Sequence, residues 1–223
     1  YARTRQLVVR RYEPERRRHV MLCCDAGRLM GSRARGTPKV DQALSALARL
    51  AAAALSRGDL VGLMIFDGEV RTVLPPRAGP GQLAKIVRAS LGVAPSAGET
   101  AYTPAFVALN HTLKRRALVV VVTDFDNEAQ GFELRRNIQA IIRRHVIMVC
   151  GVRDSVYGET IRQDVTSIDQ AYRQLAALTL LEERHSVYQR LERGGVHIID
   201  AEPEELAIPM LNRYGSIVSS GRL

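Results

Sequence analysis

Two mainly apolar runs in this chain each end in an aspartate, and this arrangement restricts the fold more than any other feature. One run covers residues 19–24 and leads to Asp25, and the other covers residues 118–123 and leads to Asp124. Apolar runs of this length are typical of strands that are buried on both faces of a parallel sheet. Because the parallel strands of an α/β sheet end at the edge where ligands bind, we expect Asp25 and Asp124 to lie close together there.

The remaining sequence predicts strands that alternate with helices. Further strands are expected at residues 60–66, 69–74, 145–152 and 196–200, and helices at residues 38–56, 81–91, 103–113, 130–144, 167–193 and 203–214. Asp67-Gly68 is a hairpin signal, so the strand after it should pair antiparallel at an edge of the sheet and end at Pro75. Residues 153–166 are polar and are expected to be irregular, and Pro209 should kink the last helix or delay its start. This order predicts an α/β fold with a doubly wound, mostly parallel six-stranded sheet, one antiparallel edge strand and Rossmann-like layering in three layers.

The chain has a formal net charge of +9, and its positive charge is concentrated near the N-terminus, where residues 1–18 hold seven arginines. We interpret residues 1–18 as a basic connector and residues 19–223 as one folded domain. A nucleic-acid partner is not expected, because the sequence lacks aromatic interleaving for base stacking and any helix-turn-helix or RNA-binding signature. Binding of nucleic acid or anionic lipid by these arginines stays a third alternative, which a steep salt dependence would support.

The cysteines and the hydropathy pattern are typical of a cytoplasmic protein. Cys23, Cys24 and Cys150 have neither the pattern of a disulfide framework nor zinc-ligand spacing, so they are expected to be reduced core residues of a cytoplasmic protein. No apolar stretch approaches the roughly 20 residues that cross a bilayer. We expect membrane contact only through segments outside this chain, upstream of Tyr1, where a basic connector suits the cytoplasmic end of an anchor.

The strand-end carboxylates are compatible with an enzyme. A dinucleotide-binding enzyme is excluded, because the glycines after the first strand do not have the Gly-x-Gly-x-x-Gly spacing that approach to a pyrophosphate requires. A Mg²⁺-dependent phosphohydrolase or nuclease that uses Asp25, Asp124 and Asp126 stays open as an alternative. The five histidines are scattered along the chain, and no general base is evident among them.

Several short stretches, in their order and spacing, are similar to those of a bacterial family. They are RQLVVRRYE at residues 5–13, GDLVGL at 58–63, VTDF at 122–125, LEER at 181–184, RGGV at 193–196, PEEL at 203–206 and LNRY at 211–214. Together they resemble the bacterial domain-of-unknown-function family 58, a branch of the von Willebrand factor A-like proteins. The resemblance extends over nearly the whole chain and implies the same six-stranded fold.

The resemblance also implies a place for a metal ion. A metal-ion-dependent adhesion site takes its ligands from Asp-x-Ser-x-Ser after the first strand, a threonine in a later loop and an aspartate after the fourth strand. Asp25, Thr100 and Asp124 match that pattern, whereas Gly27 and Leu29 replace the two serines. Mg²⁺ is the cofactor that such a site would hold, and the loss of two hydroxyl ligands weakens the expectation that it binds.

The resemblance therefore implies a non-enzymatic protein-interaction module with a degenerate adhesion site. Members of the family that this sequence resembles are commonly encoded beside MoxR-type AAA+ ATPases. The resemblance therefore implies such an ATPase as the partner and the cytoplasmic side of the inner membrane as the location. Arg28, Arg33 and Arg35 are expected to attract an acidic partner surface. Arg28 is also our candidate for the positive charge that would stand in for the ion beside Asp25 and Asp124.

Overall fold

A mixed six-stranded sheet forms the centre of the protein in a computed structural model that describes residues 17–34, 36–221 and 223. Its strands, in the spatial order β5-β4-β1-β6-β7-β8, are β5 (Val70–Arg77), β4 (Leu60–Phe66), β1 (His19–Asp25), β6 (Ala117–Thr123), β7 (Val146–Val152) and β8 (His197–Ala201). Only the β4–β5 pair is antiparallel among these neighbours. The expected doubly wound sheet with one antiparallel edge strand is confirmed.

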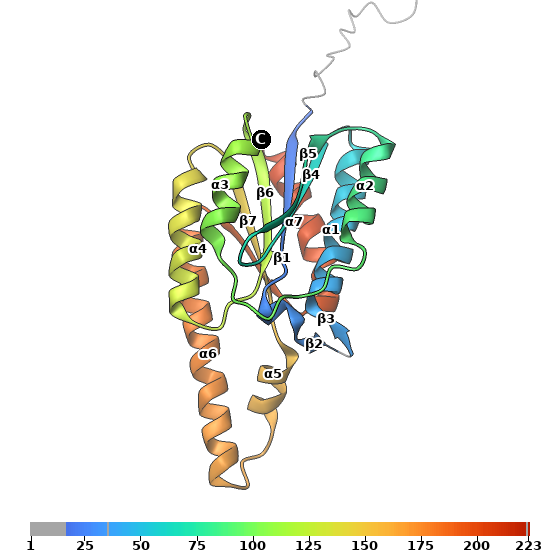
Figure 1. The fold of residues 1–223 in the computed structure, drawn as a ribbon. Coiled ribbons are helices and arrows are strands. Elements are labelled where there is room, and N and C mark those ends of the chain that lie inside the picture. Colours follow the sequence, from blue (N-terminus) through green and yellow to red (C-terminus); the bar gives the residue numbers. More distant parts are fainter. Residues whose placement is uncertain (1–16, 35, 222) are drawn as a thin grey trace, which may run out of the picture.

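Helices cover both faces of this sheet (Figure 1). One layer contains α1 (Lys39–Ser56), α2 (Pro80–Ser90) and α7 (Ala207–Ser219), and the other contains α3 (Tyr102–Thr112), α4 (Glu128–Ile141) and α6 (Ile168–Arg193). Successive residues of a strand point to opposite faces, so Leu22 and Cys24 pack in the core on the α1 side, while Met21 and Cys23 pack in the core on the α3 side. Both sets of side chains must be apolar, which explains the uninterrupted run before Asp25.

The three cysteines are core residues, as expected. Cys23, Cys24 and Cys150 are free and buried, and burial raises the pKa of each thiol well above its usual range. No helix of the described residues has the length and apolar character needed to span a bilayer. The expected basic connector lies, for residues 1–16, outside the described residues.

Two local expectations were wrong. β5 continues through Pro75 to Arg77, which an edge strand tolerates because one side of its backbone needs no ladder partner. The segment expected to be irregular contains α5 (Ser155–Arg162). The delayed start expected for the last helix is confirmed. This helix follows a short 3₁₀ turn at Pro203–Glu205 and starts at Ala207, and Pro209 lies in its first turn, where the missing N–H has no partner to lose. A two-stranded ladder, β2 (Arg33–Ala34) with β3 (Thr37–Pro38), lies between β1 and α1.

The two ends of the sheet differ in character. At the end where β1 begins, the carboxylate of Asp59 accepts hydrogen bonds from the backbone N–H of Arg18, at 3.1 Å, and from the hydroxyl of Tyr214, and so joins β1 to α7. At the opposite end, where the parallel strands terminate, α5 and the first half of α6 extend beyond the sheet (Figure 1). We call this second end the carboxyl-end face.

Candidate functional site

The carboxyl-end face brings together Asp25, Thr100 and Asp124, the three residues expected there. β1 and β6 are adjacent and parallel, with Cys24 opposite Val122, so Asp25 lies beside Thr123 at the strand ends. The hydroxyl of Thr100, from the loop before α3, donates to both carboxylate oxygens of Asp25 at 2.8 and 2.9 Å. Residues from three distant parts of the chain therefore meet at one point, where the strand pattern predicted the two aspartates and the resemblance implied Thr100.

Asp25 is completely buried, and protein groups satisfy its carboxylate. Besides Thr100, the hydroxyl of Thr123 donates to Oδ2 at 2.6 Å and the backbone N–H of Gly27 donates to Oδ1 at 2.7 Å. Tyr102 completes the network, with its hydroxyl 2.8 Å from Thr123 Oγ1. Burial raises the pKa of Asp25 to about 6, although the hydrogen bonds from Thr123, Gly27 and Thr100 favour the charged form and act against this rise.

Asp124 has two cationic partners inside the protein. The ammonium of Lys39 lies 2.8 Å from Oδ2, and the guanidinium of Arg184 donates to Oδ1. The backbone N–H of Phe125 also donates to Oδ1 at 2.9 Å. Both carboxylate oxygens of Asp124 are therefore engaged by positive charge from the chain itself.

Lys39 reaches this position because it is the first residue of α1. Its backbone N–H donates to Ser32 O at 2.9 Å, and its side chain, only 2% exposed, passes inward to the carboxylates. The ammonium also lies 3.2 Å from Oδ2 of Asp154 at the start of α5. Burial acts to raise the pKa of Asp154, but Lys39 and a backbone N–H outweigh it and lower that pKa overall. Burial of an ammonium in the low-dielectric interior is costly, and the attraction of the two carboxylates offsets that desolvation cost.

Arg184, from the middle of α6, is the second internal cation. Its guanidinium lies 3.2 Å from Oδ1 of Asp200 and is centred 5.3 Å from the ring of Phe125 and 5.2 Å from the ring of Tyr188. A Cβ on Gly151 of β7 would overlap the hydroxyl of Tyr188 and lie 2.7 Å from the guanidinium. Glycine at this strand position is therefore what allows α6 to bring Arg184 against Asp124.

The residues at this point do not fit a Mg²⁺ ion. Magnesium requires oxygen ligands in near-octahedral geometry, whereas both oxygens of Asp124 here contact cations. A Cβ on Gly27, where the adhesion-site pattern has a serine, would overlap Oγ1 of Thr100 and lie 3.1 Å from Oδ1 of Asp25. The side chain of Thr100 occupies the space that a serine side chain at position 27 would need, and its hydroxyl donates hydrogen bonds to Asp25. Across the described ranges, no group of three or more His, Cys, Asp or Glu side chains is arranged to hold a metal ion.

Two of the arginines expected at this face, Arg28 and Arg33, lie outside the buried cluster. Arg28 pairs with Asp126 at 3.4 Å in an exposed position, so the positive charge next to Asp124 comes from Lys39 and Arg184 and not from Arg28. Arg33 is exposed and donates to Gly36 O at 2.8 Å. Arg35 lies outside the described residues.

The three carboxylates of the enzyme alternative do not converge on an open site. Asp25 is enclosed by hydrogen-bond donors, Asp124 is neutralised by two cations, and Asp126 turns toward Arg28 at the surface. This arrangement leaves no pair of free carboxylates to hold a metal ion at a phosphate group.

Sequence reasoning missed both cations. Arg184 was visible only as part of the LEER stretch at 181–184. Lys39 carried a usable signal, because it is one of only three lysines among 32 basic residues and it opens a helix directly after a proline.

The arrangement of strands and helices is that of solved von Willebrand factor A-like domains. BatB from Bacteroides thetaiotaomicron is 13% identical, with a TM-score of 0.56, and the match covers 91% of this chain and 98% of that one. An aerotolerance-related membrane protein from Bacteroides fragilis is 13% identical, with a TM-score of 0.51 and coverage of 88% and 97%. The VWA domain of SpRpn10 is 11% identical, with a TM-score of 0.50 and coverage of 88% and 94%. At such identities the likeness establishes the fold alone.

The protein is therefore a von Willebrand factor A-like domain. A family model described as "Protein of unknown function DUF58" matches residues 1–160, and the chain belongs to that family. No curated protein matches the chain by sequence.

Proposed function

We propose that this domain is a non-enzymatic protein-interaction module whose carboxyl-end face binds a partner protein without a metal ion. The observation that carries the proposal is the buried pair of cations on Asp124. In a metal-dependent adhesion site the ion supplies positive charge between carboxylates and is completed by an acidic group of the partner. Lys39 and Arg184 already supply that charge here, at 2.8 Å from one oxygen and in direct contact with the other.

The exposed arginines at the rim of the face are the groups that remain for a partner. Arg28 and Arg33 are solvent-accessible next to the buried cluster, and Arg35 follows in sequence. Exposed charges of one sign steer a partner of the opposite sign and set the rate of association. An acidic protein surface is the complement that this rim favours.

A MoxR-type AAA+ ATPase is the partner that we propose, because members of the family that this sequence resembles are commonly encoded beside such ATPases. The domain would then act on the cytoplasmic side of the inner membrane, held there by segments outside this chain. We propose no catalytic role for Asp25, Asp124 or Asp126, because their carboxylates are enclosed or paired.

Binding of the full chain to a purified MoxR-type ATPase from the same organism tests this proposal. We expect association that is unchanged by EDTA or millimolar Mg²⁺ and that weakens by about tenfold in the double variant Arg28→Glu/Arg33→Glu. The matched control is Arg88→Glu/Arg143→Glu, an equal change of charge at exposed positions on α2 and after α4. Dependence on Mg²⁺, or equal loss in both double variants, would contradict the proposal.

Phosphatase and nuclease assays with Mg²⁺ or Mn²⁺ test the enzyme alternative directly. We expect no turnover above background. Turnover by the wild-type chain that Asp25→Asn abolishes would show that the domain is an enzyme and that the interaction proposal is wrong.

A further inference from the structure

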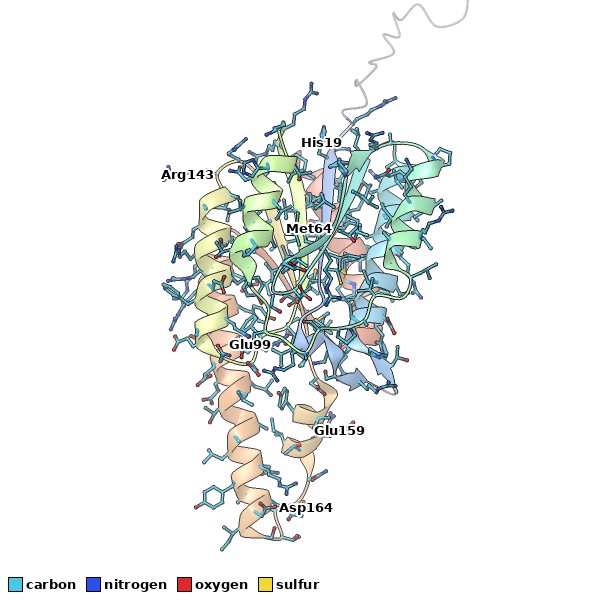
Figure 2. All side chains as sticks on the ribbon, in the orientation of Figure 1. His19, Met64, Glu99, Arg143, Glu159 and Asp164 are labelled. Atoms are coloured by element: carbon cyan, nitrogen blue, oxygen red, sulfur yellow. The ribbon has the colours of Figure 1, made fainter. Side chains whose placement is uncertain are left out.

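The part of the molecule farthest from the start of β1 is a helical projection formed by residues 155–183. It consists of α5, the connecting loop and the first part of α6, and it extends beyond the carboxyl-end face (Figure 1). Glu159 and Asp164 lie on it, at the opposite end of the molecule from His19 (Figure 2). The projection therefore stands next to the face that we propose as the interaction site.

Polar side chains hold this projection together on its inner side. The amide of Gln174, on α6, donates to three backbone carbonyl oxygens of α5 and its connecting loop: Thr160 at 3.2 Å, Ile161 at 3.1 Å and Gln163 at 2.6 Å. Those carbonyls belong to the C-terminal turn of α5, where helix geometry leaves them without partners. A glutamine thus occupies the inward position that a leucine usually has in a pair of packed helices.

Large apolar side chains lie on the outer side instead. Ile168, Tyr172 and Leu175 are 77%, 69% and 61% exposed, and their spacing of i, i+4 and i+7 places them on one stripe of α6. Leu178 continues the stripe and is 43% exposed. Soluble domains usually bury such a stripe, and a partner helix or groove recognises residues at this spacing.

Hydrogen bonds fix the start of α6 within the projection. Ser167 and Gln170 form a capping box at the start of α6, with the Gln170 N–H donating to Ser167 Oγ at 3.2 Å and the Ser167 N–H donating to Gln170 Oε1 at 3.1 Å. Gln170 Oε1 also accepts from the N–H and the hydroxyl of Thr166, both at 2.7 Å. Because the capping box orders the start of α6 before a partner binds, its apolar side chains lose little conformational entropy on binding.

The charge of the projection is opposite to that of the chain. Residues 155–183 contain five acidic side chains and two arginines, a formal charge of −3 in a protein of +9. Glu182 and Glu183 lie at the end of the stripe and have no ion-pair partner in the part of the chain that the structure describes. The negative charge of the projection repels nucleic acid, an anionic membrane surface and the projection of a second copy of this chain. The same charge complements a basic protein surface.

We propose that this projection inserts its stripe, Ile168, Tyr172, Leu175 and Leu178, into a groove of a partner protein that is apolar at its floor and basic at its rim. The inference rests on the proposed interaction function and extends it. The exposed arginines of the carboxyl-end face would contact acidic residues of the partner, and the acidic tip would contact basic ones. Contacts of both signs fix the orientation of a partner better than contacts of one sign.

Site-specific photo-cross-linking of the full chain in cells of the source organism tests the inference. The photoreactive residue p-benzoylphenylalanine replaces Tyr172, and in the matched control it replaces Ile208 on α7, which is also 69% exposed. We expect an adduct with another protein from position 172 and none from position 208. The yield at position 172 should fall about tenfold or more with Leu175→Asp, and should also fall with Glu182→Lys/Glu183→Lys.

Each of the other outcomes overturns the inference. These are no adduct at position 172, equal adducts at both positions, an adduct of two copies of this chain, and an adduct that neither the apolar nor the charge variant reduces. Circular dichroism of each purified variant shows that the domain has kept its fold.

The ATPase experiment separates this inference from the proposed function. If the adduct forms with a protein other than the ATPase, the tip inference stands and the proposed partner is wrong. If the adduct forms with the ATPase, yet the purified ATPase binds wild type and Leu175→Asp equally, the proposed partner stands and the inference about the projection is wrong.

Discussion

Replacement of Lys39 by methionine removes the ammonium that links Asp124 to Asp154 while it keeps most of the side-chain volume. The ammonium is 2.8 Å from one carboxylate and 3.2 Å from the other, and the side chain is 2% exposed. Removal of one partner from a buried ion pair costs about 3–5 kcal/mol. Because Asp124 keeps Arg184 and the side chain of Asp154 is 16% exposed, we expect the lower end, about 3 kcal/mol. In a chain of this length, that loss lowers the melting temperature by about 6–12 °C.

Urea denaturation of the full chain, followed by circular dichroism, measures this free energy of unfolding. Lys114→Met is the matched control, since Lys114 is exposed and its replacement should change stability by less than about 0.5 kcal/mol. The double variant Lys39→Met/Asp124→Asn should lose less than the sum of the two single variants, because it removes both charges of one pair. If Lys39→Met loses no more stability than Lys114→Met, or if Mg²⁺ raises the midpoint of the wild-type chain, the internal-cation account of this site is wrong.

Two further predictions concern the Asp25 side of the cluster. Gly27→Ser, alone or with Leu29→Ser, should destabilise the domain by about 1–3 kcal/mol and create no Mg²⁺ binding in calorimetry, because a Cβ at position 27 overlaps Thr100 Oγ1. The control is Gly98→Ser, because a Cβ at position 98 meets no atom within 4 Å. Heat from Mg²⁺ binding to the serine variant would show that Thr100 yields its place to an ion. Because the pKa of Asp25 is raised to about 6, the folded state keeps a proton that the unfolded state releases between about pH 4 and about pH 6. The free energy of unfolding, relative to that of Asp25→Asn, should therefore fall as the pH rises from about 4 to about 6, by about 3 kcal/mol in total. Denaturation curves of both proteins at pH 4, 5, 6 and 7 measure this difference, and parallel pH profiles would refute the prediction.

The fold was predictable because its signals are local. Each strand and helix is encoded by the periodicity of a few adjacent residues, and the strand runs at 19–24 and 118–123 are apolar because helices cover both faces of the sheet. The errors arose where local signals compete with tertiary context. Pro75 normally ends a strand, but β5 lies at an edge where one side of its backbone is unpaired. Polar residues at 153–166 suggested a loop, but Asp154 caps a helix there.

The sequence by itself determined that acids at the ends of two buried strands would meet, since parallel strands of one sheet end at one edge. It did not determine what neutralises them. Lys39 and Arg184 lie 85 and 60 residues from Asp124 along the chain, and no local pattern relates residues so far apart. Only the tertiary structure, by placing the start of α1 and the middle of α6 against the same strand end, decided that the positive charge at this site comes from the chain. The same holds for the projection, because the sequence shows its leucines and glutamines but only the packing of α5 on α6 decides which of them face outward.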